Sequence, residues 1–270
     1  MLLSGTLNGK GPFSLILDTG SSDVSITPET ARTLGLTVRD NGTVSGAGNR
    51  RVTYGSTRLA TLSFGGATLR RVDAGVVDLS QIRSKFHFAH LDGVVGYPLL
   101  QRYVTFVNVD AGTISLGAAR PRVPAGATIT PFRGVLPIVR ARIGGISTTV
   151  LVDTGDRSSL TLFGPFARRQ HFFGRYPSKV NVVTGYGLGG PIYADVFRLP
   201  RLDVLGTPLH GVVTRASRQT GGGFASADQG GSIGTGVLRR FNVVYDYPHE
   251  TIVAWPSKYF HAPDAFVPPG

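Results

Sequence analysis

Two Asp-Thr-Gly triplets are the residues of this sequence best suited to chemistry. They are Asp18, Thr19 and Gly20, and Asp153, Thr154 and Gly155. Each triplet directly follows three apolar residues, so each acid is expected at the end of a buried strand rather than on a solvated surface. The two acids stand 135 positions apart. This recurrence indicates that they belong together.

Two carboxyl groups brought together by such loops could serve as an acid and a base. At a separation of about 3 Å they cannot both ionise, so they share a proton and titrate as a coupled pair. The ionised member can take a proton from a water, while the protonated member donates to the carbonyl oxygen of an amide. This chemistry is direct hydrolysis by water, and it needs neither a metal nor a cofactor.

The rest of the chain repeats with nearly the same spacing. Glycine-rich segments begin at Gly46 and Gly185, 139 positions apart, and residues 95–116 align without gaps with a second segment at an offset of 138. Five of these 22 aligned positions are identical. A duplicated unit predicts two lobes related by a pseudo-two-fold axis, which would bring the two triplets together.

The local pattern is that of an all-β fold with a few short helices. Glycine (37) and proline (17) punctuate short β-branched runs. A linker is predicted near 118–131, with an N-terminal lobe at 1–122 and a C-terminal lobe at 123–270. The second lobe is expected to carry an inserted helix and loop at 163–175, a mobile surface loop at 217–231 and a proline-containing tail after residue 256.

The triplets and their partners resemble the motifs of the aspartic peptidases. Asp18 to Ser22 is similar to the first catalytic motif of that clan and Asp153 to Gly155 to the second. Val94-Val95-Gly96 and, less fully, Ser232-Ile233-Gly234 resemble the segment that threads under each catalytic loop. The resemblance implies a bilobal acid-protease fold, with two β-barrel-like lobes and a central cleft. Two retropepsin-like units would be fused in tandem, on the overall plan of a pepsin-like enzyme.

The resemblance also implies roles for individual residues. Asp18 and Asp153 would be the catalytic pair. Gly20 and Gly155 would let the backbone fold tightly, and Thr19 and Thr154 could hydrogen-bond across the axis. The residues expected to support the catalytic loops are Thr19, Gly20, Ser21, Thr154, Gly155 and Asp156. The residues expected in the flaps, over the substrate, are Gly46, Ala47, Gly48, Gly185, Tyr186 and Gly187.

The second triplet departs from the family at the next position. The family expects a small residue there, as at Ser21, but Asp156 and Arg157 follow. An additional acid would raise the pKa of the catalytic pair by like-charge repulsion, unless Arg157 or another cation neutralises it. The consequence would be an upward shift of the pH optimum, or a lobe that has drifted away from catalysis.

Composition excludes several other classes of protein. No cysteine is present, which excludes disulfides, thiolate catalysis and Cys-based metal sites, and no apolar run is long enough to span a membrane. The net charge of +12 is spread along the chain rather than gathered in a block, so no nucleic-acid partner is expected. Localisation stays open, with the periplasm or secretion favoured if a signal segment precedes the sequence.

We therefore expect a monomeric aspartic endopeptidase that acts on a polypeptide substrate, without metal or cofactor. The alternative is a catalytically weakened peptide-binding protein of the same fold. Taken singly, each Asp-Thr-Gly is also a plausible turn. The hypothesis that the protein binds anionic polymers is supported by its net charge alone. The glycine-rich Gly185–Gly190 is followed by Pro191 and no helix pattern, so it does not predict a dinucleotide site.

Overall fold

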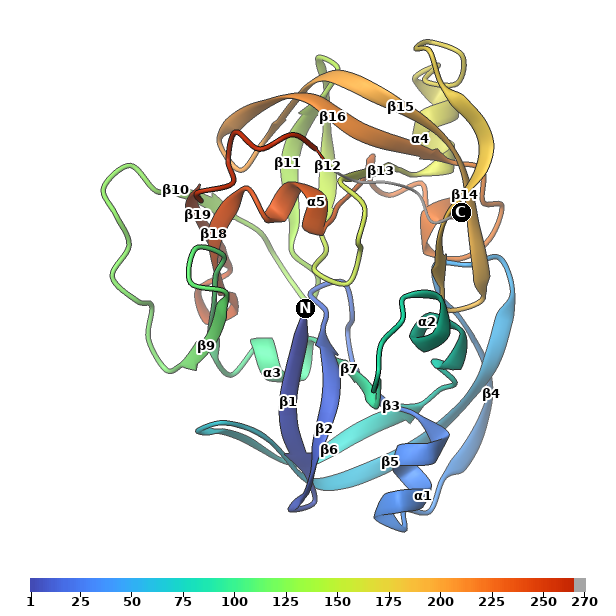
Figure 1. The fold of residues 1–270 in the computed structure, drawn as a ribbon, viewed down its shortest axis with the longest axis vertical. Coiled ribbons are helices and arrows are strands. Elements are labelled where there is room, and N and C mark those ends of the chain that lie inside the picture. Colours follow the sequence, from blue (N-terminus) through green and yellow to red (C-terminus); the bar gives the residue numbers. More distant parts are fainter. Residues whose placement is uncertain (265–270) are drawn as a thin grey trace.

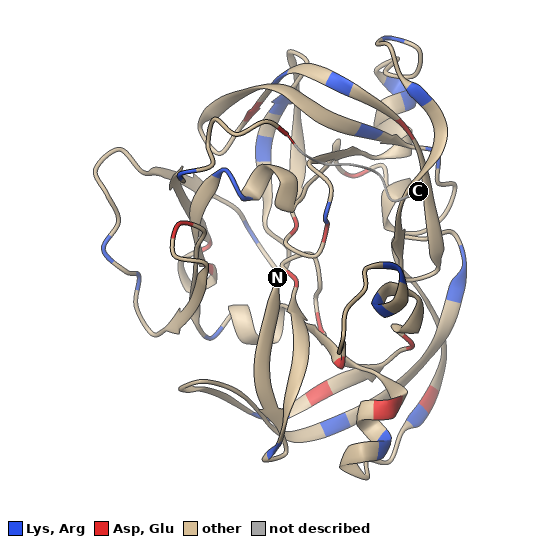
Figure 2. Ribbon diagram, viewed as in Figure 1, with Lys and Arg blue, Asp and Glu red and all other residues tan. Residues whose placement is uncertain are grey.

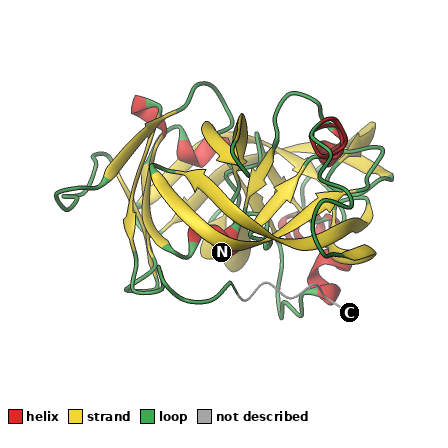
Figure 3. Cartoon of the chain, turned by 90° about the horizontal axis from the view of Figure 1, so that it is seen from above, coloured by secondary structure: helices red, strands yellow, loops and turns green. Residues whose placement is uncertain are grey.

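The computed structural model describes residues 1–264 and consists mostly of strands (Figures 1 and 3). Nineteen strands and five short α-helices occur in this part of the chain. An N-terminal lobe occupies the lower part of Figure 1 and a C-terminal lobe the upper part. The predicted all-β, two-lobe fold is confirmed. The tail expected after residue 256 is described as far as residue 264, and residues 265–270 lie outside the described part.

The N-terminal lobe is built on a seven-stranded sheet with the order β1-β2-β7-β3-β6-β5-β4. Its strands are β1 (Leu2–Leu7), β2 (Lys10–Leu17), β3 (Val24–Ile26), β4 (Arg39–Ser45), β5 (Arg51–Phe64), β6 (Ala67–Val76) and β7 (Gly93–Val95).

The C-terminal lobe repeats this plan strand for strand. Its sheet has the order β11-β12-β17-β13-β16-β15-β14, so that β11 corresponds to β1 and β17 to β7. The strands are β11 (Ile138–Ile143), β12 (Ile146–Val152), β13 (Leu160–Leu162), β14 (Lys179–Gly187), β15 (Gly190–Val204), β16 (Thr207–Ser217) and β17 (Gly231–Ile233). The repeat in the sequence therefore has a counterpart in the topology.

A five-stranded sheet joins the two lobes, in the order β10-β19-β18-β8-β9. Its strands are β8 (Val104–Asn108), β9 (Thr113–Gly117), β10 (Thr128–Pro131), β18 (Phe241–Asp246) and β19 (Thr251–Pro256). The corresponding strands β8 and β18 pair antiparallel at its centre, with Phe106 opposite Val244. Strands from both sides of residue 122 meet here, and the lobe boundary itself stays a prediction.

Four of the five short α-helices follow the same repeat. The five are α1 (Pro28–Leu34), α2 (Ser80–Lys85), α3 (Tyr97–Leu100), α4 (Gly164–Arg169) and α5 (Thr235–Leu238), and α1 corresponds to α4 and α3 to α5. Helix α1 begins at a side-chain cap, because the Thr27 hydroxyl accepts the Thr30 N–H and Pro28 occupies the first turn. Helix α4 follows β13 as α1 follows β3, so it belongs to the shared plan. Only the loop after it is longer, and the expected inserted helix is therefore a counterpart of α1.

The charged residues are spread along the chain in both lobes (Figure 2). None of the helices formed by residues 1–264 is long and apolar enough to cross a membrane.

Candidate active site

The two acids lie where β2 and β12 end, and each is tied to a short neighbouring strand. Strand β2 pairs in parallel with β7, and β12 with β17. The Asp18 N–H donates to the Val95 carbonyl at 3.0 Å, and the Asp153 N–H donates to the Ile233 carbonyl at 2.9 Å. The residues just before the acids are fully buried. Burial of the strand ends thus fixes the backbone from which each carboxyl group projects.

Glycine is required at the third position of each triplet by the opposite acid. A Cβ added to Gly155 would lie 2.5 Å from the carboxyl carbon of Asp18, and one added to Gly20 would lie 2.8 Å from that of Asp153. Each carboxyl group therefore packs directly against the other loop's backbone. The pseudo-two-fold arrangement brings the acids together, and their carboxyl groups lie within hydrogen-bonding reach of each other.

Two buried threonines lock the loops together across the axis. The Thr19 N–H donates to the Thr154 hydroxyl and the Thr154 N–H to the Thr19 hydroxyl, both at 3.0 Å. The Thr19 hydroxyl donates in turn to the Val152 carbonyl at 2.6 Å, and the Thr154 hydroxyl to the Leu17 carbonyl at 2.8 Å. Four reciprocal hydrogen bonds thus join the lobes directly beneath the acids.

Removing either hydroxyl should therefore weaken the fold. The Thr19→Val and Thr154→Val variants are each expected to lower the free energy of unfolding by about 2 kcal/mol, because a buried N–H and a buried carbonyl lose their partner. Urea unfolding at pH 7 measures this loss. The Thr19→Ser variant keeps the hydroxyl and should lose less than half as much. Equal losses in the serine and valine variants would contradict this role of the hydroxyls.

The carboxyl groups are held by backbone N–H groups and are half-buried. Gly20 N–H donates to Asp18 Oδ1 at 2.8 Å, while Gly155 and Asp156 N–H donate to Asp153 Oδ1 at 2.8 and 3.0 Å. Burial, followed by the charges of Asp18 and Asp156, raises the pKa of Asp153 well above its usual value. Burial also raises the pKa of Asp18, against the opposing hydrogen bond from Gly20. The pair therefore retains a proton at a higher pH than an ordinary aspartate does.

Asp156 points away from Asp18 and Asp153, into the C-terminal lobe, where a buried arginine neutralises it. Arg215 Nη2 lies 3.0 and 3.1 Å from its two carboxylate oxygens, and both side chains are 4% exposed. The Ser158 N–H and the Thr161 hydroxyl donate to the same carboxylate at 2.8 and 2.9 Å. Burial alone would raise the pKa of Asp156, but Arg215 and these donors hold it below its usual value. Asp156 is therefore an ionised partner of Arg215.

Arg157, the residue next to Asp156, does not neutralise this acid. Arg157 is exposed, and its guanidinium lies over the ring of Phe86, 4.4 Å from the ring centre. The neutralising cation is Arg215, which is 59 positions further along the chain. At the corresponding place in the N-terminal lobe, the Ser21 hydroxyl donates to the backbone carbonyl of Asp23 at 3.2 Å.

The tips of the two predicted flaps meet each other. The hairpin of β4 and β5 touches the hairpin of β14 and β15, and Figure 1 shows the two extending toward one another. The Gly48 N–H donates to the Leu188 carbonyl at 2.8 Å, and the Arg50 N–H to the Gly189 carbonyl at 3.1 Å. The backbones touch so closely that a Cβ at Gly48 would collide with Gly189. The C-terminal tip lies at residues 188–189, just past the predicted Gly185, Tyr186 and Gly187.

Each tip also packs its side chain into the opposite lobe. Ala47 packs against an apolar cluster of the C-terminal lobe, formed by Phe163, Ile192 and Phe224. Leu188 packs against an N-terminal cluster whose buried members are Val77, Leu79 and Leu91. The contact between the lobes at the flaps is therefore reciprocal.

The prediction of a mobile surface loop at 217–231 is wrong for the central part of this segment. The side chains of Gln219 and Phe224 are buried, because this segment packs against the N-terminal flap. The Gly223 N–H donates to the Gly46 carbonyl at 2.9 Å, and the Gln219 amide donates to the Ala47 carbonyl at 3.4 Å. Its glycines allow close contact with the flap rather than mobility in solvent.

Two tyrosines on the flap hairpins, Tyr54 of β5 and Tyr186 of β14, lie in different surroundings. The Tyr54 ring fills the space over Gly75, where an added Cβ would lie 2.6 Å from it. Tyr186 lies on β14, and the ammonium group of Lys85 is 4.9 Å from its ring centre. Neither of these contacts involves Asp18 or Asp153.

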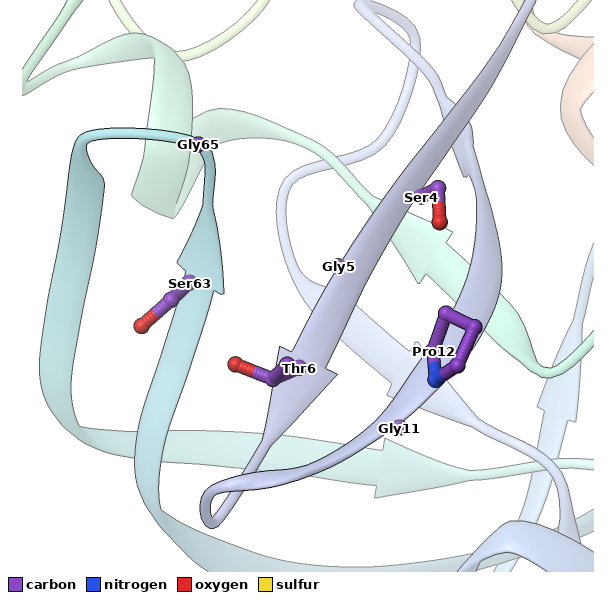
Figure 4. A pocket seen from close by; sticks show the side chains of 7 residues that line it. All are labelled: Ser4, Gly5, Thr6, Gly11, Pro12, Ser63 and Gly65. Carbon is purple, nitrogen blue, oxygen red and sulfur yellow. The ribbon is translucent and has the colours of Figure 1, made fainter.

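Two pockets on the outer surfaces of the lobes lie apart from the acids. One, of about 360 Å³, is lined by Ser4, Gly5, Thr6, Gly11, Pro12, Ser63 and Gly65 (Figure 4). The other, of about 730 Å³, lies at the corresponding position of the C-terminal lobe, between β11, β12 and β15. Neither lining includes a residue of the triplets or the flaps, so the candidate site is the paired triplets and not these pockets.

Most of the N-terminal lobe matches a known protein family. Residues 3–99 match the family model described as aspartyl protease. The chain resembles the aspartic peptidases. The match includes the first triplet and the partner motif that ends at Gly96, and it stops before the second triplet. The topology extends the resemblance, because the second lobe repeats the strand order of the first. A search of curated proteins found no match.

Sequence reasoning missed Arg215, Leu188 and Gln219. Only Arg215 left a signal, because it stands among the strand residues 212–216 as a lone charge in a run that is otherwise apolar or hydroxylic. A buried charge requires a partner, and Asp156 is the unexplained acid. The packing of Leu188 and Gln219 depends on contacts between the lobes that no local pattern records.

Proposed function

We propose that the protein is an aspartic endopeptidase, with Asp18 and Asp153 as its catalytic residues. The observation that carries this proposal is the direct packing of each carboxyl group against the glycine of the other triplet. The coupled, upward-shifted pKa values of the two groups support it. The family match of residues 3–99 supports the peptidase class.

In this mechanism a water bound between the carboxyl groups attacks the peptide carbonyl carbon. Asp18, taken as the ionised member, accepts a proton from the water, while Asp153 donates its proton to the carbonyl oxygen. The tetrahedral intermediate then collapses: its C–N bond breaks, the amine nitrogen receives a proton from Asp18, and a hydroxyl proton returns to Asp153. The proton belongs to the pair as a whole, and it is written here on Asp153, whose pKa is raised by burial first and then by the charges of Asp18 and Asp156.

The substrate would be an extended peptide lying between the flap tips and the acids. The hydrogen bonds between the flap tips, from Gly48 to Leu188 and from Arg50 to Gly189, would have to open to admit it. A chain end could thread more easily than a folded domain. We therefore expect unfolded polypeptides to be better substrates than compact proteins.

A mixed peptide library tests the proposal. The wild-type protein should create new peptide ends between about pH 3 and 8, the range in which a shifted pair acts, and the Asp18→Asn variant should create them on the order of 10⁴-fold more slowly. Turnover near the wild-type rate in Asp18→Asn or Asp153→Asn would overturn the proposal. Peptide affinity without turnover at any pH would instead support the second candidate, a binding protein of this fold, which is motivated by the additional acid Asp156.

A further inference from the structure

Arg215 has no counterpart in the N-terminal lobe. In the parallel pairing of β13 with β16, Arg215 lies beside Thr161, and in the pairing of β3 with β6 the same place belongs to Gly75, beside Ser25. Duplication therefore gives an internal comparison, in which one lobe has a glycine where the other has a buried cation.

The neighbouring positions changed together with it. The registers of β5 with β6 and of β15 with β16 make Ala194 the counterpart of Tyr54. In the N-terminal lobe the Tyr54 ring fills the space over Gly75. In the C-terminal lobe the register puts the small Ala194 opposite Ser217, diagonal to the large Arg215, and Asp156 takes the place of Ser21. An aromatic filling in one lobe thus corresponds to an ion pair in the other.

Arg215 contacts three parts of the C-terminal lobe at once. Its Nη2 binds Asp156, whose N–H donates to the catalytic Asp153 at 3.0 Å. Its Nη1 lies 3.5 Å from the Thr184 carbonyl of β14, the flap strand. Its guanidinium lies 5.1 Å from the ring centre of Phe224, which belongs to the cluster that receives Ala47.

We propose that Arg215 is a positioning residue that acts through Asp156, fixing the backbone of the Asp153 loop and joining that loop to both flaps. This inference rests on the proposed function for its catalytic consequence. Closure of the flaps over a peptide would then be coupled to the alignment of Asp153 in the C-terminal lobe. In the N-terminal lobe Tyr54 and Gly75 carry no charge and cannot form such an ionic connection.

The nearby charged groups have other partners. Asp195 on β15 binds Arg218, whose Nη2 lies 2.7 Å from its carboxylate, and Arg157 lies over Phe86. The Arg218 and Asp195 pair resembles the proposed one in chemistry and lies at the edge of the same sheet, where its other side-chain contacts are with the Asn181 N–H and the Phe173 ring. Arg218→Met is therefore a matched control for loss of an arginine beside a buried carboxylate.

The test compares the single variants Arg215→Lys, Arg215→Met and Arg218→Met with a double variant that combines Asp156→Ser and Arg215→Met. We expect kcat on a cleaved peptide to fall about 100-fold in Arg215→Met and about 10-fold in Arg215→Lys, since a misplacement of about 1 Å costs roughly that much. The double variant leaves no buried charge unpaired, so its melting temperature should recover while kcat stays at least about 10-fold low. Arg218→Met should change kcat less than about 3-fold.

Amide hydrogen exchange gives a readout that does not require turnover. In the double variant, the amide hydrogens of residues 153–156 and of residues 184–188 should both exchange faster than in the wild type. In Arg218→Met their exchange rates should be unchanged. A double variant with wild-type kcat, or with unchanged exchange at 153–156, would overturn the positioning role. Absence of wild-type turnover would instead overturn the proposed function, and the exchange data would still decide whether Arg215 fixes the loop.

Discussion

The Asp153→Asn and Asp18→Asn variants are each expected to lower kcat on the order of 10⁴-fold, the largest effect that any single change should produce. Asparagine keeps the size of the side chain but can neither accept a proton from water nor donate a carboxyl proton. The two acids form one unit, so the double variant should be hardly slower than either single variant. Initial rates on one cleaved peptide, measured for all three, check this. Effects that multiply in the double variant would contradict the shared-proton mechanism.

The Asp153→Asn variant also provides its own folding control. The folded-state pKa of Asp153 is raised, so its contribution to stability is present below the unfolded value of about 3.9 and is lost as the pH rises through the folded value. Asparagine does not ionise and escapes this loss. The variant should therefore melt at a higher temperature than the wild type at pH 7, with the difference shrinking below about pH 4. An inactive variant that is also less stable at pH 7 would indicate misfolding instead.

The Gly155→Ala variant is expected to lower kcat about 100-fold or more, although it adds only a methyl group. That group would lie 2.5 Å from the carboxyl carbon of Asp18, so the carboxyl group or the loop must move. A displacement of about 1 Å in a catalytic group costs roughly 100-fold in rate. Gly20→Ala should act in the same way through Asp153, somewhat more mildly, because its added Cβ would lie 2.8 Å away.

Gly66→Ala is the control for this substitution. Nothing lies within 4 Å of a Cβ added to Gly66, and its backbone is not in the left-handed region. It should leave kcat within about 2-fold of wild type, as expected for a change that touches nothing. Wild-type kcat in Gly155→Ala, with an unchanged KM, would show that the two triplets do not work face to face.

The paired triplets could be predicted from the sequence because both strong signals are local. Apolar runs ending in Asp18 and Asp153 predict buried strands with acids at their ends, and the offset between the triplets predicts a duplicated fold. The reciprocal bonds between Thr19 and Thr154 follow from the same symmetry, since equivalent loops must meet at a pseudo-two-fold axis. Repetition in the sequence thus supplied information about long-range contacts.

The partner of Asp156 could not be predicted in this way. Arg215 is distant in the sequence, and only the parallel register of β13 with β16 brings it beside the catalytic loop. The sequence suggests the adjacent Arg157 as the partner of Asp156, but the side chain of Arg157 lies over Phe86. The expectation of mobility at 217–231 failed for a similar reason, because the glycines there allow contact with the other lobe's flap, whose position depends on the whole fold.

The neutralisation of Asp156 bears on whether the C-terminal lobe has drifted from catalysis. An unpaired acid beside Asp153 would have favoured that interpretation. A buried, paired carboxylate with donors from Ser158 and Thr161 is instead an ordered part of the loop. Burial raises the pKa of Asp18 and Asp153 most, and the charge of Asp156 still adds to this rise, so we expect activity to extend to higher pH than in a variant such as Asp156→Asn.

Sharing of one proton by Asp18 and Asp153 can be observed directly in their side-chain carboxyl ¹³C resonances, followed from pH 3 to 9. Both resonances should shift in the same pH steps, and the last proton should leave well above the ordinary aspartate pKa of about 3.9. Two independent single-step curves, each centred near about 3.9, would contradict it.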